Sequence, residues 1–244
     1  VRENREQLVD GVRADRGEDA RPVERHAHRP VRLRPVVGQV GQVLEAGDRA
    51  FNITALNHDL SVYDIFGCLA AGAGLVIPDE DKRREPKHWF ELMQAHRVTL
   101  WNSVPALMDM LLESSDEQAT LANLRVIILG GDWVSPSLPE AIHQLAPGAN
   151  LLSIGGPTET TVWNIWYFMN EVKADWPNIP YGKPISNSKY FILNTSGKPC
   201  PVWVPGELCA AGEGVAQGYL NDPENTQRSF VNHPFNGEPI YKTG

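Results

Sequence analysis

The sequence lacks the features of a membrane protein, a disulfide-bonded scaffold or a nucleic-acid-binding protein. Its 244 residues contain no apolar run of about 18 residues, so no transmembrane helix is predicted. An apolar signal core is also missing near the first residue, which favours a cytoplasmic protein without a membrane partner. The three cysteines are odd in number and widely spaced, which predicts neither disulfides nor a metal site. A net charge of −8 disfavours a nucleic-acid partner, because phosphate contacts need clustered Lys and Arg.

Residues 1–50 lack Ser, Thr, Lys, Ile, Met, Cys, Phe, Tyr and Trp, and they contain ten arginines. Without aromatic residues or Ile, this segment has only Val, Leu and Ala to build a core. Two interpretations remain open: a disordered basic leader, or a translation of GC-rich DNA in the wrong reading frame. The composition favours the second. We therefore expect residues 1–50 not to pack as a native subdomain, and we assign the leader itself to residues 1–45.

From Ala55 onward, apolar segments alternate with helical ones. The predicted helices cover residues 60–71, 89–96, 106–113 and 136–145. The predicted strands cover residues 75–78, 98–102, 124–129 and 150–154. Continuous apolar strands separated by helices predict an α/β fold, in which a mostly parallel sheet is layered with helices. We assign this core to residues 46–176.

The alternation of helices and apolar strands ends in the last third of the chain. Residues 190–193 and 207–210 are short strand candidates among Pro and Gly turns. They predict a smaller β-rich subdomain, part of a distorted barrel, over residues 177–244. We expect this subdomain to be truncated at residue 244.

The segment Gly155-Gly-Pro-Thr-Glu-Thr160 follows a predicted buried strand. A Gly-rich turn lets the backbone approach a phosphate, a Thr hydroxyl can bond its oxygens, and a Glu can hold Mg²⁺. Ligands of parallel sheets bind beyond the carboxyl ends of the strands, where this turn falls. A plain strand-to-loop turn with a solvated Glu159 is the alternative interpretation.

Two further segments follow in order: residues 206–219 are GELCAAGEGVAQGY, and residues 241–244 are YKTG. Together with GPTE, they resemble the AMP-forming adenylating superfamily of acyl-CoA synthetases, luciferases and nonribosomal adenylation domains. The resemblance extends from about residue 48 to residue 244. It implies that Thr158 contacts the α-phosphate of ATP and that Glu159 binds the Mg²⁺ cofactor.

The resemblance also implies where the nucleotide binds. The implied ATP and AMP site consists of Gly130, Gly131, Asp132, Gly155, Gly156 and Thr158. In many relatives a Tyr occupies the position of Gly155 and helps to hold the adenine ring. That contact must be weaker here or come from elsewhere in the chain.

The segment His58 to Phe66 is similar to the one by which amino-acid-activating members of the superfamily recognise their substrate. Asp59 would pair with the substrate ammonium, which distinguishes amino acids from acids that lack the amine. Asp59 could instead cap the helix that it precedes. His58 takes the place next to the acyl carbon and completes an implied catalytic set with Thr158 and Glu159.

The pocket positions that the resemblance implies are Asp59, Leu60, Tyr63, Asn102, Ile128, Gly130, Ile154, Val162 and Trp163. Two large rings and several branched side chains leave little volume, and a charged substrate side chain would stay unpaired. We therefore expect a small amino acid. The order Asp-Leu-Tyr-Asn, ending in Trp, resembles cysteine-activating domains, which favours cysteine, whereas Gly130 and Trp163 also resemble glycine-activating domains. Ordinary core packing is the alternative for Tyr63 and Trp163.

The resemblance implies that the parent domain forms an aminoacyl-AMP from ATP and passes it to the phosphopantetheine of a peptidyl carrier domain. The Pro-Lys-Gly phosphate loop and the mobile C-terminal subdomain of the family have no counterpart in the sequence. We therefore expect an internal fragment that is inactive by itself. An acyl- or aryl-CoA ligase of the same superfamily and an inactive remnant are the alternatives.

Overall fold

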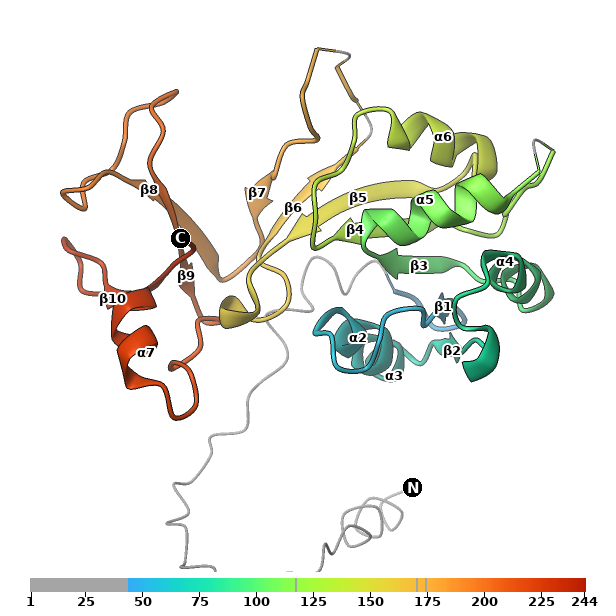
Figure 1. The fold of residues 1–244 in the computed structure, drawn as a ribbon, viewed down its shortest axis with the longest axis horizontal. Coiled ribbons are helices and arrows are strands. Elements are labelled where there is room, and N and C mark those ends of the chain that lie inside the picture. Colours follow the sequence, from blue (N-terminus) through green and yellow to red (C-terminus); the bar gives the residue numbers. More distant parts are fainter. Residues whose placement is uncertain (1–43, 117, 170, 174) are drawn as a thin grey trace, which may run out of the picture. The chain divides into compact units, whose positions relative to one another are not determined.

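The computed structural model describes residues 44–116, 118–169, 171–173 and 175–244 (Figure 1). Apart from its last two residues, the predicted leader over residues 1–45 lies outside this part, and its interpretation stays a prediction. The expectation that residues up to 50 do not pack is wrong for those next to the core: Asp48 and Ala50 are buried, and a strand begins at Arg49. Composition misjudged them because Ala50 needs no aromatic neighbour in its own segment and packs instead in a cluster with residues far along the chain. Among the described residues, no helix is long and apolar enough to cross a bilayer.

The larger sheet has seven strands in the order β2-β1-β3-β4-β5-β6-β7. They are β1 (Arg49–Phe51), β2 (Gly74–Val76), β3 (Leu100–Ser103), β4 (Val126–Gly130), β5 (Asn150–Gly155), β6 (Ile165–Phe168) and β7 (Lys183–Pro184). The strands from β2 to β5 pair in parallel, whereas β6 and β7 are antiparallel. The prediction of a mostly parallel sheet layered with helices is confirmed.

Successive residues of the parallel strands face two separate cores. On β4, Ile127 and Leu129 belong to one hydrophobic cluster, and Val126 and Ile128 belong to the other. Because strand side chains alternate between faces, both faces of the sheet are covered. This double burial explains why these strands are mostly apolar in sequence.

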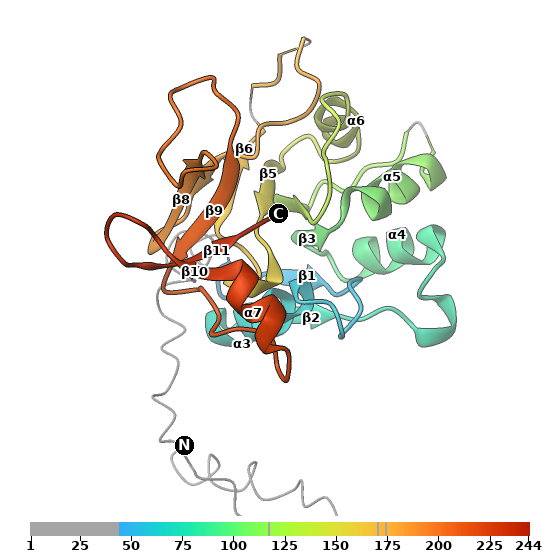
Figure 2. The same ribbon diagram turned by 60° about the vertical axis from the view of Figure 1, so that its left-hand side comes forward.

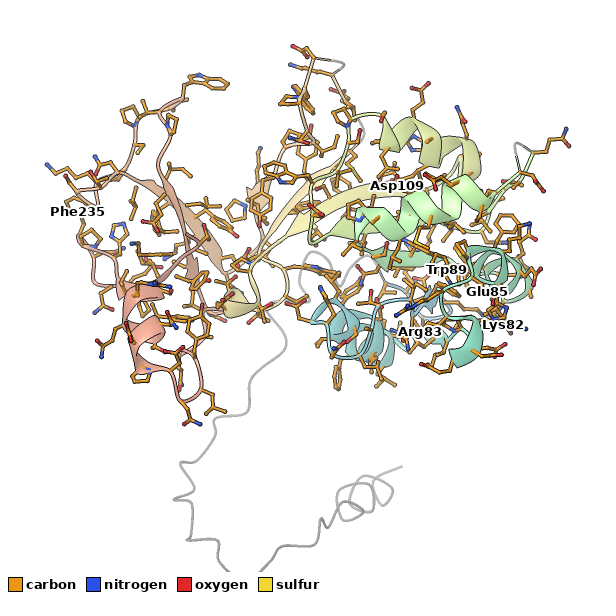
Figure 3. The ribbon with its side chains drawn as sticks, in the orientation of Figure 1. Lys82, Arg83, Glu85, Trp89, Asp109 and Phe235 are labelled. Carbon is orange, nitrogen blue, oxygen red and sulfur yellow. The ribbon has the colours of Figure 1, made fainter. Side chains whose placement is uncertain are left out.

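Helices α4 (Pro86–Ala95), α5 (Pro105–Ser114) and α6 (Leu138–Leu145) supply the first cluster. All three have a Pro in the first turn, where the missing N–H costs nothing. Figure 3 labels Trp89 on α4, whose ring centroid lies 6.2 Å from that of Trp101 on β3. The predicted helices 89–96 and 106–113 are confirmed, although α4 begins three residues earlier.

The second cluster is supplied by the helical run 60–71, as predicted. The run consists of α2 (Leu60–Val62), a π-helical turn (Tyr63–Gly67) and α3 (Cys68–Ala71). It ends at Gly72, whose φ of 72° is the left-handed conformation that glycine adopts at helix ends. The views in Figures 1 and 2 place α2 and α3 beneath the sheet and α5 and α6 above it.

The smaller sheet is antiparallel, with the strand order β10-β11-β9-β8. Its strands are β8 (Ser188–Leu193), β9 (Glu207–Gly212), β10 (Phe230–Asn232) and β11 (Pro239–Lys242), and α7 (Pro223–Ser229) precedes β10. The predicted β-rich part is confirmed, but α7, β10 and β11 were not predicted. Strand β7 follows the predicted boundary at residue 176, yet it pairs with β6 of the larger sheet.

Candidate active site

Two segments that lie 99 residues apart meet at the carboxyl end of β5. The Thr158 hydroxyl donates a hydrogen bond of 2.6 Å to the Oδ2 atom of Asp59. The other carboxylate oxygen of Asp59 lies 3.1 Å from Nδ1 of His58. The structure thus brings together the predicted phosphate contact, the predicted amine partner and the predicted catalytic His58.

Asp59 occupies the N-cap position of α2, as the alternative interpretation supposed. Its side chain, however, makes no cap hydrogen bond to the helix. The carboxylate is directed to Thr158 and His58 instead. Capping therefore does not explain why a carboxylate stands here.

The neighbouring Glu159 is held by two tyrosines from the C-terminal part of the chain. The Tyr219 hydroxyl donates to Oε1 of Glu159 at 2.6 Å, and it lies 3.3 Å from the Tyr241 hydroxyl. Burial favours a higher pKa, but the hydrogen bonds from Tyr219, the backbone and Tyr241 outweigh it and lower the pKa of Glu159. An ionised carboxylate is the hard oxygen ligand that Mg²⁺ prefers.

Glu159 would need further ligands to hold that ion. Among the residues that the structure describes, no group of three or more His, Cys, Asp or Glu side chains could bind a metal. Mg²⁺ in nucleotide sites is held by one or two carboxylates together with phosphates and water. Glu159 fits this arrangement, and its role as a magnesium ligand stays a prediction.

A cavity of about 550 Å³ opens beside the GPTE turn. Its lining is Gly131, Asp132, Trp133, Val134, Ser153, Ile154, Gly155, Gly156, Pro157, Ile179, Tyr181, Leu208 and Thr243. Four of the residues predicted to bind ATP thus border one space, which is large enough for a nucleoside. Gly130 is not in the lining: a Cβ on it would lie 2.7 Å from the carbonyl oxygen of Ile154, so β4 and β5 pack closely there.

Tyr181 is a lining residue that sequence reasoning missed. A Cβ built on Gly155 would lie only 2.2 Å from Cε2 of this ring. The ring therefore occupies the space that a side chain at position 155 would need. The missing side chain at Gly155 was visible in the sequence and indicated an open space. It did not indicate which distant residue fills that space.

Six of the predicted pocket residues share one hydrophobic cluster. They are Leu60, Tyr63, Ile128, Ile154, Val162 and Trp163. The rings of Tyr63 and Trp163 lie 4.5 Å apart between centroids, so they also pack on each other. Tyr63 and Trp163 therefore pack as core residues, as the alternative interpretation supposed, and their role in a substrate pocket stays a prediction.

Asn102 is fully buried and is tied to a carboxylate that the sequence analysis did not single out. Its amide nitrogen donates to Asp64 Oδ1 at 2.8 Å and to the Leu60 carbonyl at 3.3 Å. Asn52 donates to the other oxygen of Asp64 at 3.3 Å. Within the described residues, Oδ1 of Asn102 has no hydrogen-bond partner. Among these residues, the oxygen is thus the part of the Asn102 amide that has no partner, and the role of Asn102 in substrate binding stays a prediction.

Asn164, also missed, braces the GPTE turn from below. Its backbone N–H donates to the Gly155 carbonyl at 2.9 Å, and its side-chain amide donates to the Thr160 hydroxyl. The Tyr190 hydroxyl in turn donates to Oδ1 of Asn164. A buried amide with all of these contacts holds the turn in one conformation.

The chain is similar to known proteins in its sequence. The family model described as AMP-binding enzyme matches residues 26–220. Bacitracin synthase 1 of Bacillus licheniformis is 44% identical over 197 residues, covering 81% of this chain and 4% of that protein. Pyochelin synthetase PchE of Pseudomonas aeruginosa is 42% identical over 202 residues, covering 82% and 14%. The chain thus spans a small part of these curated relatives.

The chain is also similar in fold to solved structures. The nonribosomal peptide synthetase FmoA3 (S1046A) in its α-methyl-L-serine-AMP-bound form is 42% identical, with a TM-score of 0.81 over 86% of this chain and 24% of that one. The same protein is solved in an AMPPNP-bound form. The Vibrio cholerae adenylation domain AlmE, in complex with glycyl-adenosine-5′-phosphate, is 28% identical, with a TM-score of 0.76 over 86% of this chain and 40% of that one.

Proposed function

Because this chain belongs to the AMP-binding enzyme family, as an adenylation-domain homologue of nonribosomal peptide synthetases, we propose that it forms the nucleotide and amino-acid site of a domain that makes an aminoacyl-AMP. The substrate carboxylate attacks the α-phosphorus of ATP, and pyrophosphate leaves. Such chemistry depends on positioning and on stabilising charge.

The contact between Thr158 and Asp59 carries this proposal. The reaction joins a carboxylate to a phosphate, so the groups that hold the substrate amine and the α-phosphate must lie close together. Their oxygens are 2.6 Å apart in the chain. In this proposal Thr158 turns its hydroxyl to the α-phosphate when substrates bind, which releases the Asp59 carboxylate for the ammonium group.

In this proposal, Glu159 and the glycine turns bind the nucleotide and its magnesium ion. Gly131, Gly155 and Gly156 let the backbone approach the ligand at the cavity wall. Glu159 holds the magnesium ion, which neutralises the phosphate charge when it is bound. The two tyrosines behind Glu159 keep its carboxylate ionised and oriented.

The substrate in this proposal is a small amino acid, with cysteine favoured. The Tyr63 and Trp163 rings fill much of the pocket, and the unpartnered Oδ1 of Asn102 can accept one hydrogen bond from a thiol or hydroxyl. The small aminoacyl adenylates bound in FmoA3 and AlmE support a small substrate here. A peptidyl carrier domain bearing phosphopantetheine would receive the product.

Aminoacyl-sulfamoyl adenosines test the proposal without needing catalysis, because they imitate the bound product. Calorimetric titration of the chain should give the tightest binding for the cysteinyl compound, followed by the glycyl, seryl and alanyl ones. Asp59→Asn should weaken the cysteinyl compound by about 2–4 kcal/mol, as a charge that loses its partner does. Tighter binding of the phenylalanyl, leucyl or glutamyl compound would refute the small pocket.

A sulfamoyl adenosine whose acyl group lacks the amine is the matched control. It offers nothing to Asp59, so wild type and Asp59→Asn should bind it about equally. An equal loss on both compounds would make Asp59 a structural residue. Tighter binding of the compound without an amine by the wild type would favour the acyl-CoA ligase alternative.

A further inference from the structure

The cavity beside the GPTE turn contains an aromatic ring with no assigned task. Tyr181 comes from the segment just before β7, which pairs with β6. Its Cε2, Cζ and Oη atoms lie 2.2, 2.6 and 2.8 Å from the position that a Cβ on Gly155 would take. The phenol end of the ring thus rests directly on the Gly155 backbone, and only glycine permits this.

The backbone beside Tyr181 is also closely packed. Gly182 has a φ of 106°, in the left-handed region that favours glycine. A Cβ on Gly182 would lie 1.9 Å from the Trp166 carbonyl oxygen, so this residue is pressed against β6. The ring therefore has a firm base at the sheet.

A second ring fixes its orientation. The Tyr190 ring meets Tyr181 edge to face, with centroids 6.3 Å apart, and the Tyr190 hydroxyl is anchored on Asn164. Burial raises the pKa of Tyr181, so its phenol stays neutral at physiological pH. Tyr181 is nevertheless 47% exposed. It is a fixed, neutral and half-open ring that borders a cavity.

We propose that Tyr181, whose ring fills the space that Gly155 leaves without a side chain, is the platform on which the adenine ring of the nucleotide packs. The inference rests on the proposed function, because it presumes that this cavity receives the nucleotide. A ring held in place before binding loses little conformational entropy when a base stacks on it. The apolar neighbours Ile154, Ile179 and Leu208 suit the remaining faces of a purine.

Trp133 is the rival ring in the same lining. It is 74% exposed, and its backbone N–H donates to Oδ1 of Asp132. An indole so exposed has to be ordered when a base stacks on it, which costs free energy. The geometry therefore favours Tyr181 over Trp133.

Binding of adenosine to the 244-residue chain tests the platform, because adenosine has a base but no phosphate. By calorimetry, Tyr181→Ala should bind adenosine and AMP about tenfold more weakly, as expected when one aromatic partner of a base is removed. Tyr181→Phe should stay within about twofold of wild type, since the ring rather than the hydroxyl makes the contact. Phe235→Ala, in the loop between β10 and β11, is the matched control (Figure 3).

The outcomes separate this inference from the proposed function. If wild type binds AMP and Tyr181→Ala binds it equally well, the platform is overturned and the nucleotide site stands. If Trp133→Ala alone loses binding, the base packs on Trp133 and the inference is wrong. If wild type binds neither AMP nor adenosine, both proposals fail.

A stability cycle covers the case in which Tyr181→Ala folds poorly. Gly155→Ala should lower the melting temperature of wild type, because the new methyl group meets the Tyr181 ring. The same change should cost clearly less in the Tyr181→Ala background. An equal cost in both backgrounds would mean that the ring does not rest on Gly155, and it would overturn the inference.

Discussion

The amino and carboxyl ends of the parallel strands in the larger sheet differ in whether their polar groups already have hydrogen-bond partners. At the amino ends of β1, β3 and β4, Asp48 accepts hydrogen bonds from the Thr99 hydroxyl at 2.7 Å, from Nε of Arg125 at 2.8 Å and from the Glu45 backbone at 2.7 Å. This buried carboxylate is surrounded by donors from three places in the chain. It ties the strands together, and its oxygens already have partners.

The carboxyl ends of the same strands carry glycines and polar groups with capacity to spare. Gly131, Gly155 and Gly156 line a cavity, and Oδ1 of Asn102 has no partner among the described residues. Beside Asn102, Asp64 in the π-helical turn is buried, and its side-chain partners among the described residues are the amides of Asn52 and Asn102. The comparison teaches that polar groups at one end of the parallel strands can stabilise the fold, while those at the other end stay available for a ligand.

Removing the charge of Asp48 at the amino ends of the strands should have the largest effect on stability. Asp48→Asn should lower the free energy of unfolding by about 3 kcal/mol, because it leaves the Arg125 guanidinium without its anion. Urea denaturation at pH 7 measures this change. Glu80→Gln removes an exposed ion pair with Arg83 and should cost less than about 0.5 kcal/mol.

The amino ends of the strands should also respond to acid. Burial favours a higher pKa for Asp48, but the hydrogen bonds from Arg125, Glu45 and Thr99 outweigh it and lower that pKa below its ordinary value. The stabilisation is therefore present above about pH 4 and is lost as the pH falls through the folded-state pKa. If the Asp48→Asn deficit persisted undiminished at the lowest pH, the ion-pair account would be wrong.

Asp64 should show the opposite dependence. Burial raises its pKa to about 7, and hydrogen bonds from Asn102 and Asn52 offset only part of that rise. Between about pH 4 and 7 the folded chain keeps a proton that the unfolded chain releases, so stability falls as the pH rises. We expect wild type to lose about 2 kcal/mol between pH 5 and 7 relative to Asp64→Asn. Parallel denaturation curves for the two proteins would contradict this expectation.

Thr158 should affect the ligand more than the fold. Thr158→Val removes the hydroxyl but keeps the shape, so AMP affinity should fall about tenfold, which corresponds to about 1.4 kcal/mol. The free energy of unfolding should change by less than about 1 kcal/mol, since the bond to Asp59 is exposed. Calorimetry and urea denaturation on one preparation measure both. A larger loss of stability than of affinity would make Thr158 a structural residue.

A modest effect is expected at Tyr219. Tyr219→Phe removes the hydrogen bond to Glu159 and should cost about 1 kcal/mol of stability. It should also raise the pKa of Glu159, since that hydrogen bond holds it down. Titration of the Glu159 carboxyl by NMR would detect this shift. An unchanged pKa would mean that the other groups around Glu159 determine its ionisation.

Much of the larger sheet could be predicted from local patterns. Apart from Arg125, Asn150 and Ser153, residues 124–129 and 150–154 are apolar and are closed by glycine pairs, and β4 and β5 form from them. Runs of this kind have few alternatives, because a strand that is buried on both faces is mostly apolar. Strand β1 was missed because it has only three residues and begins with Arg49.

The smaller sheet was harder to predict. Strands β10 and β11 are short and contain Asn, Pro and Lys, so their sequences carry little strand signal. They form because they pair with each other and with β9. Pairing partners that are distant in sequence are invisible to any local pattern.

The sequence by itself determined the alternation of helices and strands from residue 60 to residue 155, the glycine turns and the identity of the motif residues Asp59, Thr158 and Glu159. Only the tertiary structure decided that Thr158 meets Asp59, that Asn102 is held by Asp64, and that Tyr181 rests on Gly155. Local patterns report the faces and ends of single elements, because these depend on neighbouring residues. Contacts between the ends of different strands depend on how the sheet assembles, and no short stretch of sequence contains that information.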